Sequence, residues 1–233
     1  MDRPVRAVFL DVGGPLYPDE NFLTAAVIAL NELRSTDGVA PVSTTEVTMV
    51  FDFVRNTEGA SMRKTFAAEF LGDEKLATML HAAIAPHWRH PAGTLYSDVV
   101  PFLTLVSPHV RVGIVANQEQ ETKDALIRDG VAPFIQSWGL SGLVGKEKPS
   151  PEFFEWALHD LGIEAAEALH VGNRFDTDVL PAHSLGLRTA WILRGEAPDE
   201  PPAHQLHVAD FVAHDLSELG HLLAPLLERS TAG

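Results

Sequence analysis

Short apolar runs alternate with helix-length segments through the second half of the chain, and this rhythm constrains the fold most. Apolar runs occupy residues 110–116, 135–138, 168–171 and 188–193, and a last one lies near Phe211. Segments with helical signals separate the first four runs. Strands that alternate with helices form a parallel sheet, because each helix returns the chain to the same end of the sheet. We therefore predict an α/β fold in which helices flank a parallel sheet.

The first apolar run, residues 5–10, ends at Asp11 and leads into a Gly-rich turn at residues 13–15. This pattern is typical of a buried parallel strand that feeds a loop. From about residue 20 to residue 90 the apolar residues follow helical spacing, and no strand signal interrupts them. We predict a core of residues 1–16 and 95–233, with residues 17–94 forming an inserted helical cap.

The charge of the chain favours a small-molecule substrate. The 233 residues carry a formal net charge of -15. Nucleic acids and anionic membranes both select surfaces with clustered Lys and Arg, so we expect neither as a partner. No apolar stretch approaches the length of a membrane span. The absence of Cys favours a cytoplasmic location, and nothing in the sequence indicates an oligomeric state.

Four polar or Gly-rich segments follow predicted strands or precede helices. They are residues 11–16, 116–118, 146–149 and 172–178. In open parallel sheets the ligand lies outside the carboxyl ends of the strands. We therefore expect these four segments to converge on one site.

These segments resemble the four motifs of the haloacid dehalogenase-like superfamily. Residues 9–16 are similar to its first motif, D-x-D-G-T-L after a strand, and residues 112–117 are similar to its second, a strand ending in Ser or Thr and then Asn. Residues 148–154 match the third motif, K-P-x-P-x-I-F, and residues 171–182 resemble the fourth, V-G-D-R-x-D-N-D-x-x-P-A. The chain is identified as a member of subfamily I, which implies a Rossmann-like core with a helical cap.

The resemblance implies a hydrolase that works through a covalent aspartyl intermediate on Asp11. Lys148 would neutralise charge on the nucleophile and on the transferred group. Arg63 begins a cap helix and is a candidate for substrate contact, because caps in this family close over the site. The implied catalytic residues are Asp11, Lys148 and Asp176, and the implied substrate-binding residues are Gly14, Arg63 and Asn117.

A magnesium ion is the cofactor that the resemblance implies. Its ligands would be Asp11, the backbone carbonyl of Gly13, Asn173 and Asp178, and the ion would screen the repulsion between carboxylate and phosphate. Asn173 stands where the family has a metal-binding Asp. An amide oxygen carries no net charge, so we expect weakened magnesium affinity.

Three other departures bear on activity. Gly13 replaces the second Asp of the first motif, which acts as general acid and base in family phosphatases; Pro15 replaces Thr, and Ala116 replaces the phosphate-binding Ser or Thr. A glycine cannot transfer a proton, and general acid–base catalysis is worth about a hundredfold to ten-thousandfold. We expect impaired hydrolysis of ordinary phosphomonoesters.

Three functional hypotheses follow. The leading one is a magnesium-assisted hydrolase that acts on a small phosphorylated metabolite, with atypical or weak turnover. The second is a metal-independent 2-haloacid dehalogenase-like hydrolase, since such enzymes lack the second Asp of the first motif and carry N-x-x-D in the fourth, the spacing of Asn173 and Asp176 here. The third is a protein that binds a ligand or partner without turnover, because a fold does not guarantee a function.

Overall fold

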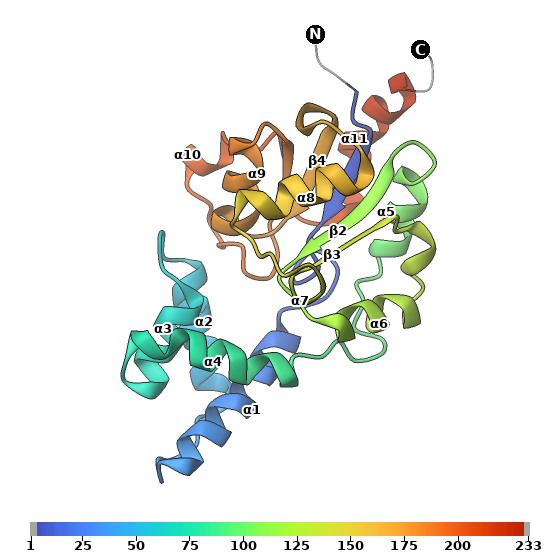
Figure 1. Cartoon of the computed structure of the whole chain (residues 1–233). Coiled ribbons are helices and arrows are strands. Elements are labelled where there is room, and N and C mark those ends of the chain that lie inside the picture. The colour runs from blue at the N-terminus through green and yellow to red at the C-terminus, as the bar shows by residue number, and fades with distance from the viewer. Residues whose placement is uncertain (1–3, 231–233) are drawn as a thin grey trace. The chain divides into compact units, whose positions relative to one another are not determined.

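The computed structural model describes residues 4–230, which form two compact units. Of the described residues, one unit comprises residues 4–18, 92–197 and 201–230, and the other comprises Asp19–Pro91 and Pro198–Glu200. All strands of the described chain lie in the first unit (Figure 1). The main segment of the helical unit, residues 19–91, is a few residues shorter than the predicted insert 17–94. Residues 198–200 also belong to this unit, and the sequence did not indicate this.

The first unit contains a six-stranded parallel sheet with the strand order β3-β2-β1-β4-β5-β6. This architecture confirms the predicted α/β fold with a helical insertion between β1 and β2. The strands are β1 (Ala7–Leu10), β2 (Arg111–Ala116), β3 (Ser137–Leu140), β4 (Ala168–Gly172), β5 (Arg188–Ile192) and β6 (Phe211–Ala213).

The position of β3 differs from the predicted strand at 135–138. A 3-10 turn at Ala132–Phe134 occupies the chain just before it, and the side chain of Gln136 accepts a hydrogen bond from the N–H of Val112 at 2.6 Å. The paired residues of the ladder with β2 begin at Ser137, opposite Gly113, although the backbone N–H of Gln136 already donates to the carbonyl of Val112 at 2.8 Å.

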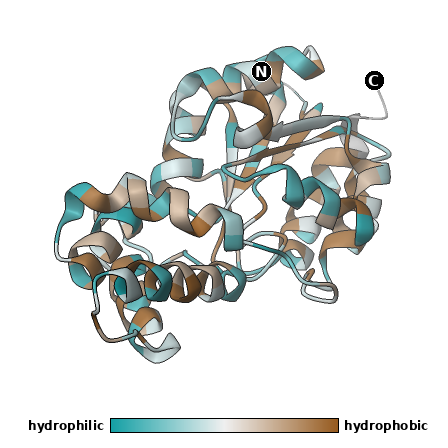
Figure 2. Ribbon diagram, turned by 60° about the horizontal axis from the view of Figure 1, so that its bottom comes forward, coloured by the Kyte–Doolittle hydropathy of each residue, from teal (hydrophilic) through white to brown (hydrophobic). Residues whose placement is uncertain are grey.

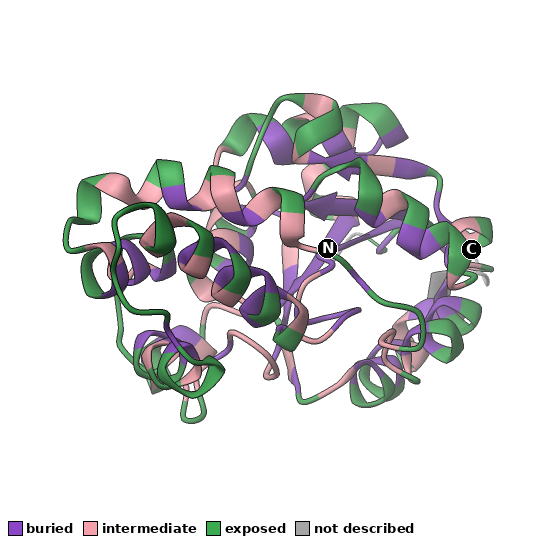
Figure 3. Ribbon diagram, turned by 90° about the horizontal axis from the view of Figure 1, so that it is seen from below, coloured by how far each residue is buried: buried purple, intermediate pink, exposed green. Residues whose placement is uncertain are grey.

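Helices cover both faces of the sheet because successive residues of the buried strands point to opposite faces. Val8 and Leu10 pack in one hydrophobic cluster with residues of α5 (Val99–Val106), α6 (Gln120–Arg128) and α11 (Leu216–Ser230). Ala7 and Phe9 pack in another with residues of α8 (Pro151–Leu161) and α9 (Leu180–Ser184). The strands are consequently buried along almost their whole length (Figure 3). Two short helices complete this unit, α7 (Ser141–Val144) and α10 (Ala203–Leu206).

The helical unit has a hydrophobic core of its own. Its helices are α1 (Glu20–Thr36), α2 (Thr44–Arg55), α3 (Met62–Leu71) and α4 (Ala77–Ile84). Hydrophobic and hydrophilic residues alternate along these helices (Figure 2), and the buried set includes Leu30, Phe51 and Phe66. Residues 198–200 belong to this unit because Asp199 pairs with Arg55 at 2.8 Å.

No helix among residues 4–230 is both long enough and apolar enough to span a membrane.

Candidate active site

The carboxyl ends of β1, β2 and β4 carry the polar segments of the candidate site. Asp11 directly follows β1, and its backbone N–H donates to the carbonyl of Val171 in β4 at 2.9 Å, which continues the ladder by one residue. Asn117 directly follows β2, and Asn173 directly follows β4. Lys148 lies in the loop that precedes α8. The parallel topology therefore brings residues far apart in sequence to one edge of the sheet.

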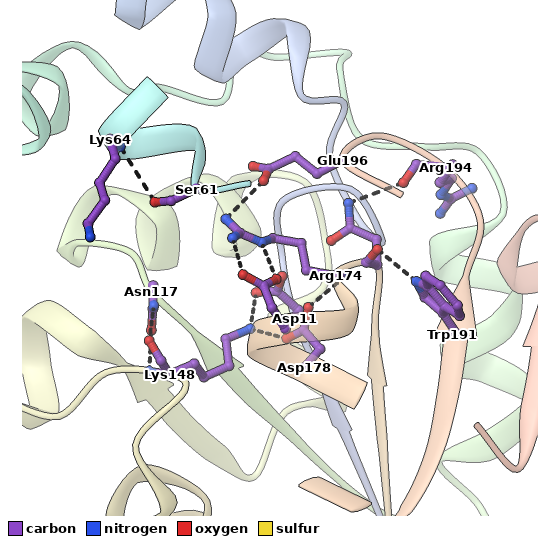
Figure 4. A network of polar contacts seen from close by, with 12 residues as sticks. Asp11, Ser61, Lys64, Asn117, Lys148, Arg174, Asp178, Trp191, Arg194 and Glu196 are labelled. Carbon is purple, nitrogen blue, oxygen red and sulfur yellow. Dashed lines mark hydrogen bonds and ion pairs between the residues drawn. The ribbon is translucent and has the colours of Figure 1, made fainter. Parts of the chain in front are cut away.

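Lys148 bridges two buried carboxylates at this edge (Figure 4). Its Nζ lies 2.9 Å from Oδ1 of Asp11 and 2.5 Å from Oδ1 of Asp178. The side chains of Lys148 and Asp178 are 3% and 0% exposed, whereas that of Asp11 is 12% exposed. Of the two carboxylates, Asp11 is the one that retains access to solvent and to a substrate.

The pKa values of the two carboxyl groups move in opposite directions. Burial raises the pKa of Asp11 to about 6, an increase that the positive charge of Lys148 limits and the negative charge of Asp178 reinforces. Burial also acts to raise the pKa of Asp178, but the charge of Lys148 and the hydrogen bond from His170 outweigh it and hold that pKa far below its usual range. Burial opposes the charged form of Lys148, yet both carboxylates together raise its pKa. The site thus pairs Asp178, whose pKa is lowered, with Asp11, whose pKa is raised.

Asp178 makes three contacts with donor groups. Besides Lys148, its Oδ1 lies 3.1 Å from Nε2 of His170, and its Oδ2 accepts from the backbone N–H of Arg174 at 3.1 Å. A Cβ on Gly172 would lie 2.3 Å from the Cβ of Asp178, so only glycine allows β4 to pass this close. These contacts fix the orientation of Asp178 and, through it, the ammonium of Lys148.

His170 is a site residue that the sequence did not single out. It lies fully buried in β4, against the ring of Phe154 at a centroid distance of 5.1 Å, and burial lowers its pKa. A neutral imidazole can still donate its Nε2 proton to Asp178. The one available signal was a lone histidine within an apolar strand, directly before the fourth motif.

The side chain of Asn117 is engaged by the main chain of Lys148. Its Nδ2 donates to the Lys148 carbonyl at 2.8 Å, and its Oδ1 accepts from the Lys148 N–H at 2.7 Å. This two-point contact fixes the loop that carries Lys148. Both polar atoms of the Asn117 side chain are thus engaged within the protein, and its contact with substrate stays a prediction.

Gly14 and Asn173 lie against each other. Gly14 has φ +84°, and a Cβ there would lie 1.9 Å from Nδ2 of Asn173. Asn173 is buried, and its Nδ2 donates to the carbonyl of Arg194 at 3.1 Å. Its own carbonyl accepts from Nε1 of Trp191 at 2.9 Å (Figure 4). The first and fourth motifs are thus packed together at this point.

The structure does not bring Asp176 to Lys148. The Asp176 side chain is 61% exposed, and its Oδ2 pairs with Nη2 of Arg174 at 2.8 Å. Arg174 also pairs with Glu196 at 2.9 Å, a contact that the sequence did not reveal. Asp178, two residues later, occupies the position beside Lys148.

Arg63 belongs to the helical unit and is exposed in the first turn of α3. Ser61 directly precedes that helix as its N-cap, and its side chain accepts a hydrogen bond from the N–H of Lys64 at 3.5 Å (Figure 4). This cap satisfies one of the N–H groups that a helix start leaves without an intrahelical partner.

The donor set at the sheet edge fits magnesium in kind but carries little charge. Asp11, the Gly13 carbonyl and Asn173 offer only oxygen ligands, which magnesium prefers. Both oxygens of Asp178 already accept hydrogen bonds. Among residues 4–230 no group of three His, Asp or Glu side chains is arranged to hold a metal. One carboxylate, that of Asp11, therefore remains for an ion, and the weakened affinity stays a prediction.

Comparisons with known proteins agree with the third and fourth motifs, which lie within the residues that a family model matches. The model of the HAD-hydrolase-like family matches residues 146–219. A glyceraldehyde 3-phosphate phosphatase of Methanopyrus kandleri is 28% identical over 214 residues, which cover 89% of this chain and 92% of that protein.

Solved structures share the fold. The HAD-hydrolase YfnB of Bacillus subtilis, bound to magnesium, has a TM-score of 0.68 at 18% identity, with 95% of this chain and 99% of that chain covered. A 2-haloacid dehalogenase of Pseudomonas syringae has a TM-score of 0.59 at 20% identity, with coverage of 95% and 99%. Because a structure named as a HAD-hydrolase and one named as a 2-haloacid dehalogenase share this fold, the fold alone does not distinguish phosphatase from dehalogenase chemistry.

Proposed function

Because this chain is a phosphatase-type hydrolase of the haloacid dehalogenase-like superfamily, we propose that it hydrolyses a small phosphorylated metabolite through a covalent intermediate on Asp11. The observation that carries the proposal is the bridge from Lys148 to both Asp11 and Asp178. It supplies a partly exposed carboxylate, a fixed positive charge beside it and a buried anion that keeps that charge in place.

The size of the substrate is inferred from charge and from similarity. The relative from Methanopyrus kandleri is named for glyceraldehyde 3-phosphate, a small phosphorylated metabolite. The net charge of -15 disfavours long phosphate polymers, which bind to basic surfaces. A single phosphoryl group next to Lys148 is compatible with both observations.

The reaction has two steps. In the first, a carboxylate oxygen of Asp11 forms a bond to phosphorus while the bond from phosphorus to the leaving oxygen breaks, and the leaving group departs with the electron pair. In the second, a water oxygen forms a bond to the phosphorus of the aspartyl phosphate while the bond from phosphorus to the Asp11 oxygen breaks; the protons of the water leave with the inorganic phosphate, and Asp11 is regenerated as a carboxylate. Lys148 reduces the repulsion between the carboxylate and the phosphoryl oxygens in both steps.

A magnesium ion would be held by Asp11, the Gly13 carbonyl and Asn173. When bound, it supplies positive charge that screens the phosphoryl oxygens from the carboxylate. Since magnesium is commonly held by one or two carboxylates together with substrate phosphates, the substrate would complete this site.

The residue at position 13 restricts the leaving group. Gly13 cannot protonate a departing alkoxide, whereas acyl and aryl phosphates release anions that need no proton. We therefore propose that the preferred substrates carry an activated leaving group.

The position of Asp176 disfavours the dehalogenase-like hypothesis. That hypothesis assigns Asp176 to the activation of water, but this side chain is largely exposed and paired with Arg174. The acidic residue that contacts Lys148 is Asp178, at the spacing of the phosphatase-like motif.

Trapping of the intermediate tests the proposal. Wild-type protein is mixed with acetyl phosphate and magnesium, quenched in acid and digested, and the peptide that contains Asp11 is examined by mass spectrometry for an added phosphoryl group. We expect the modification in wild type and in Asp124→Asn, an exposed control on α6, and none in Asp11→Asn. Hydrolysis of acetyl phosphate without a modified Asp11 would contradict the proposed mechanism. Release of chloride from a 2-chloro acid, lost in Asp176→Asn, would favour the dehalogenase-like hypothesis instead.

A further inference from the structure

Arg194 reaches from the end of β5 back to the loop that follows β1. Its Nε donates to the carbonyl of Gly14 at 3.0 Å, and its Nη2 donates to the carbonyl of Pro15. The loop 13–15 starts two residues after Asp11. One side chain from a distant strand therefore holds two consecutive carbonyls beside the nucleophile.

The guanidinium of Arg194 is itself anchored on two sides. Its Nη1 lies 2.8 Å from Oδ2 of Asp98, and its Cζ lies 4.0 Å from the ring centre of Tyr96, a stacking contact. The same Oδ2 of Asp98 accepts from the backbone N–H of Leu216, the first residue of α11, at 2.8 Å. The N-terminal ends of α5 and α11 thus fix the position of Arg194, which in turn contacts the loop after β1.

The main chain of Arg194 contacts the other motif. Its carbonyl accepts from Nδ2 of Asn173 at 3.1 Å. Arg194 therefore contacts the loop of the first motif through its side chain and the fourth motif through its backbone carbonyl. A change in its position would disturb both loops at once.

We propose that Arg194 is a positioning residue that holds the loop after β1 and thereby orients Asp11; this inference rests on the proposed nucleophilic role of Asp11. The hydrogen bonds to Gly14, Pro15 and both oxygens of Asp98 use four of the five N–H groups of the guanidinium. The guanidinium is therefore occupied by contacts within the protein and is not available to bind a substrate.

The loop depends on such an anchor for a physical reason. Gly13 and Gly14 have no side chains to pack, and glycine loses more conformational freedom on ordering than other residues. Buried carbonyls that lose a donor are costly, at about 1–3 kcal/mol each. Without Arg194, the carbonyls of Gly14 and Pro15 would turn toward water, and the direction of the Asp11 side chain would no longer be fixed.

The test compares Arg194→Ala and Arg194→Lys with Arg111→Ala. Arg111 lies at the first residue of β2, at the opposite end of the sheet, where its guanidinium also donates to a backbone carbonyl, that of Leu161. Two measurements are made on each full-length protein: amide hydrogen exchange of the peptide that spans residues 12–17, and the kinetics of acetyl phosphate hydrolysis, which give kcat and KM. A third is the recovery of kcat in Arg194→Ala upon addition of guanidinium ion at millimolar concentration.

We expect faster exchange at residues 12–17 and about a hundredfold lower kcat in Arg194→Ala, with little change in KM, because misplacement of a reacting group by about 1 Å costs this much. Arg194→Lys retains the charge but not the fork, so we expect an intermediate loss of kcat, and guanidinium ion should restore part of the kcat of Arg194→Ala. Arg111→Ala should match wild type in both measurements.

An Arg194→Lys protein with wild-type kcat, or faster exchange without loss of kcat, would overturn the inference. If Arg194→Ala does not fold, the same measurements of hydrogen exchange and kcat on Arg194→Lys test the inference. A wild-type protein without hydrolysis would contradict the proposed function instead, and the exchange data would then still report whether Arg194 orders the loop.

Discussion

The ammonium of Lys148 lies 2.9 Å from the carboxylate of Asp11, and this ion pair shares its single positive charge with a second carboxylate. Burial, reinforced by the negative charge of Asp178, raises the pKa of Asp11 to about 6, while Lys148 and His170 hold the pKa of Asp178 below its usual range. A raised pKa means that the ionised form of Asp11 is held at a cost to the folded protein. The site therefore stores electrostatic strain at the residue proposed as nucleophile.

Replacement of Lys148 by Met should lower the free energy of unfolding and abolish phosphorylation of Asp11. Removal of one member of a buried ion pair costs about 3–5 kcal/mol, because the remaining charge is left uncompensated. We expect a loss of this order in the free energy of unfolding by urea. Lys146→Met, in the same loop at an exposed position, should leave stability within about 0.5 kcal/mol of wild type. A Lys148→Met protein of wild-type stability would contradict the assigned charge balance.

Asp11→Asn should stabilise the protein at alkaline pH while removing activity. The folded-state pKa of Asp11 is about 6, above the value of 3.8 for the free group, so its ionisation destabilises the folded state as pH rises through 6. An Asn carries no charge to be buried. In buffers that contain a metal chelator, we expect the variant to exceed wild type by about 1–3 kcal/mol near pH 8. The difference in unfolding free energy between variant and wild type should decrease as pH falls toward 4. A difference that stays constant with pH would show that the effect arises from packing and not from the charge of Asp11.

Gly14→Ala should cost more than its backbone conformation alone explains. The φ of +84° disfavours alanine by about 1–2 kcal/mol, and the new Cβ would lie 1.9 Å from Nδ2 of Asn173. Gly93 has φ +83° and no atom within 4 Å of the Cβ that an alanine would add, so Gly93→Ala isolates the conformational cost. We expect thermal unfolding at a clearly lower temperature for Gly14→Ala than for Gly93→Ala. Equal shifts would show that the contact with Asn173 adjusts freely.

The order of strands and loops was predictable because it depends on local patterns. The alternation of apolar runs located all six strands, with one displaced by two residues, and the spacing of four polar segments placed Asp11 and Lys148 in one site. These features repeat over short distances in the sequence, so they can be found without a structure. The convergence of the loops then follows from the geometry of parallel strands.

The partner of Lys148 within the fourth motif was not predictable. Asp176 and Asp178 are of the same type and two residues apart, and only the π-helical turn Phe175–Val179 determines that Asp178 points inward. The contact of Asn117 with the main chain of Lys148 and that of Arg194 with Gly14 join segments 31 and 180 residues apart. Such contacts depend on the packed structure, and no local pattern encodes them.

Asn173→Asp should strengthen magnesium binding. A carboxylate adds a second charged ligand to the one that Asp11 provides, and magnesium sites commonly use one or two carboxylates. The gain is opposed by loss of the hydrogen bond from Nδ2 to the carbonyl of Arg194. We expect calorimetric titration to show tighter binding in the variant than in wild type, with Asp11→Asn binding more weakly than either. Absence of binding in all three proteins would remove magnesium from the proposed function.

Gly13→Asp should extend activity to alkyl phosphates. Gly14 requires a left-handed backbone, but Gly13 does not have a positive φ, so an L-residue at position 13 meets no such restriction. A carboxyl group two residues after Asp11 could protonate the leaving oxygen, an effect worth up to about a hundredfold to ten-thousandfold in kcat/KM. The ratio of alkyl to acyl phosphate turnover, measured at saturating magnesium, is the informative quantity.

The controls for this variant separate proton transfer from packing. Gly13→Asn has nearly the same shape but no titratable proton, so we expect its ratio of alkyl to acyl phosphate turnover to stay at the wild-type value. The gain in Gly13→Asp should also depend on pH, because a protonated carboxyl group is needed when the leaving group departs, and the nearby charge of Asp11 favours that protonated form. If both variants raise alkyl phosphate turnover equally, the missing proton donor does not limit the wild-type reaction. The restriction on the leaving group would then have to arise from Pro15 or Ala116, where the sequence also departs from the motifs.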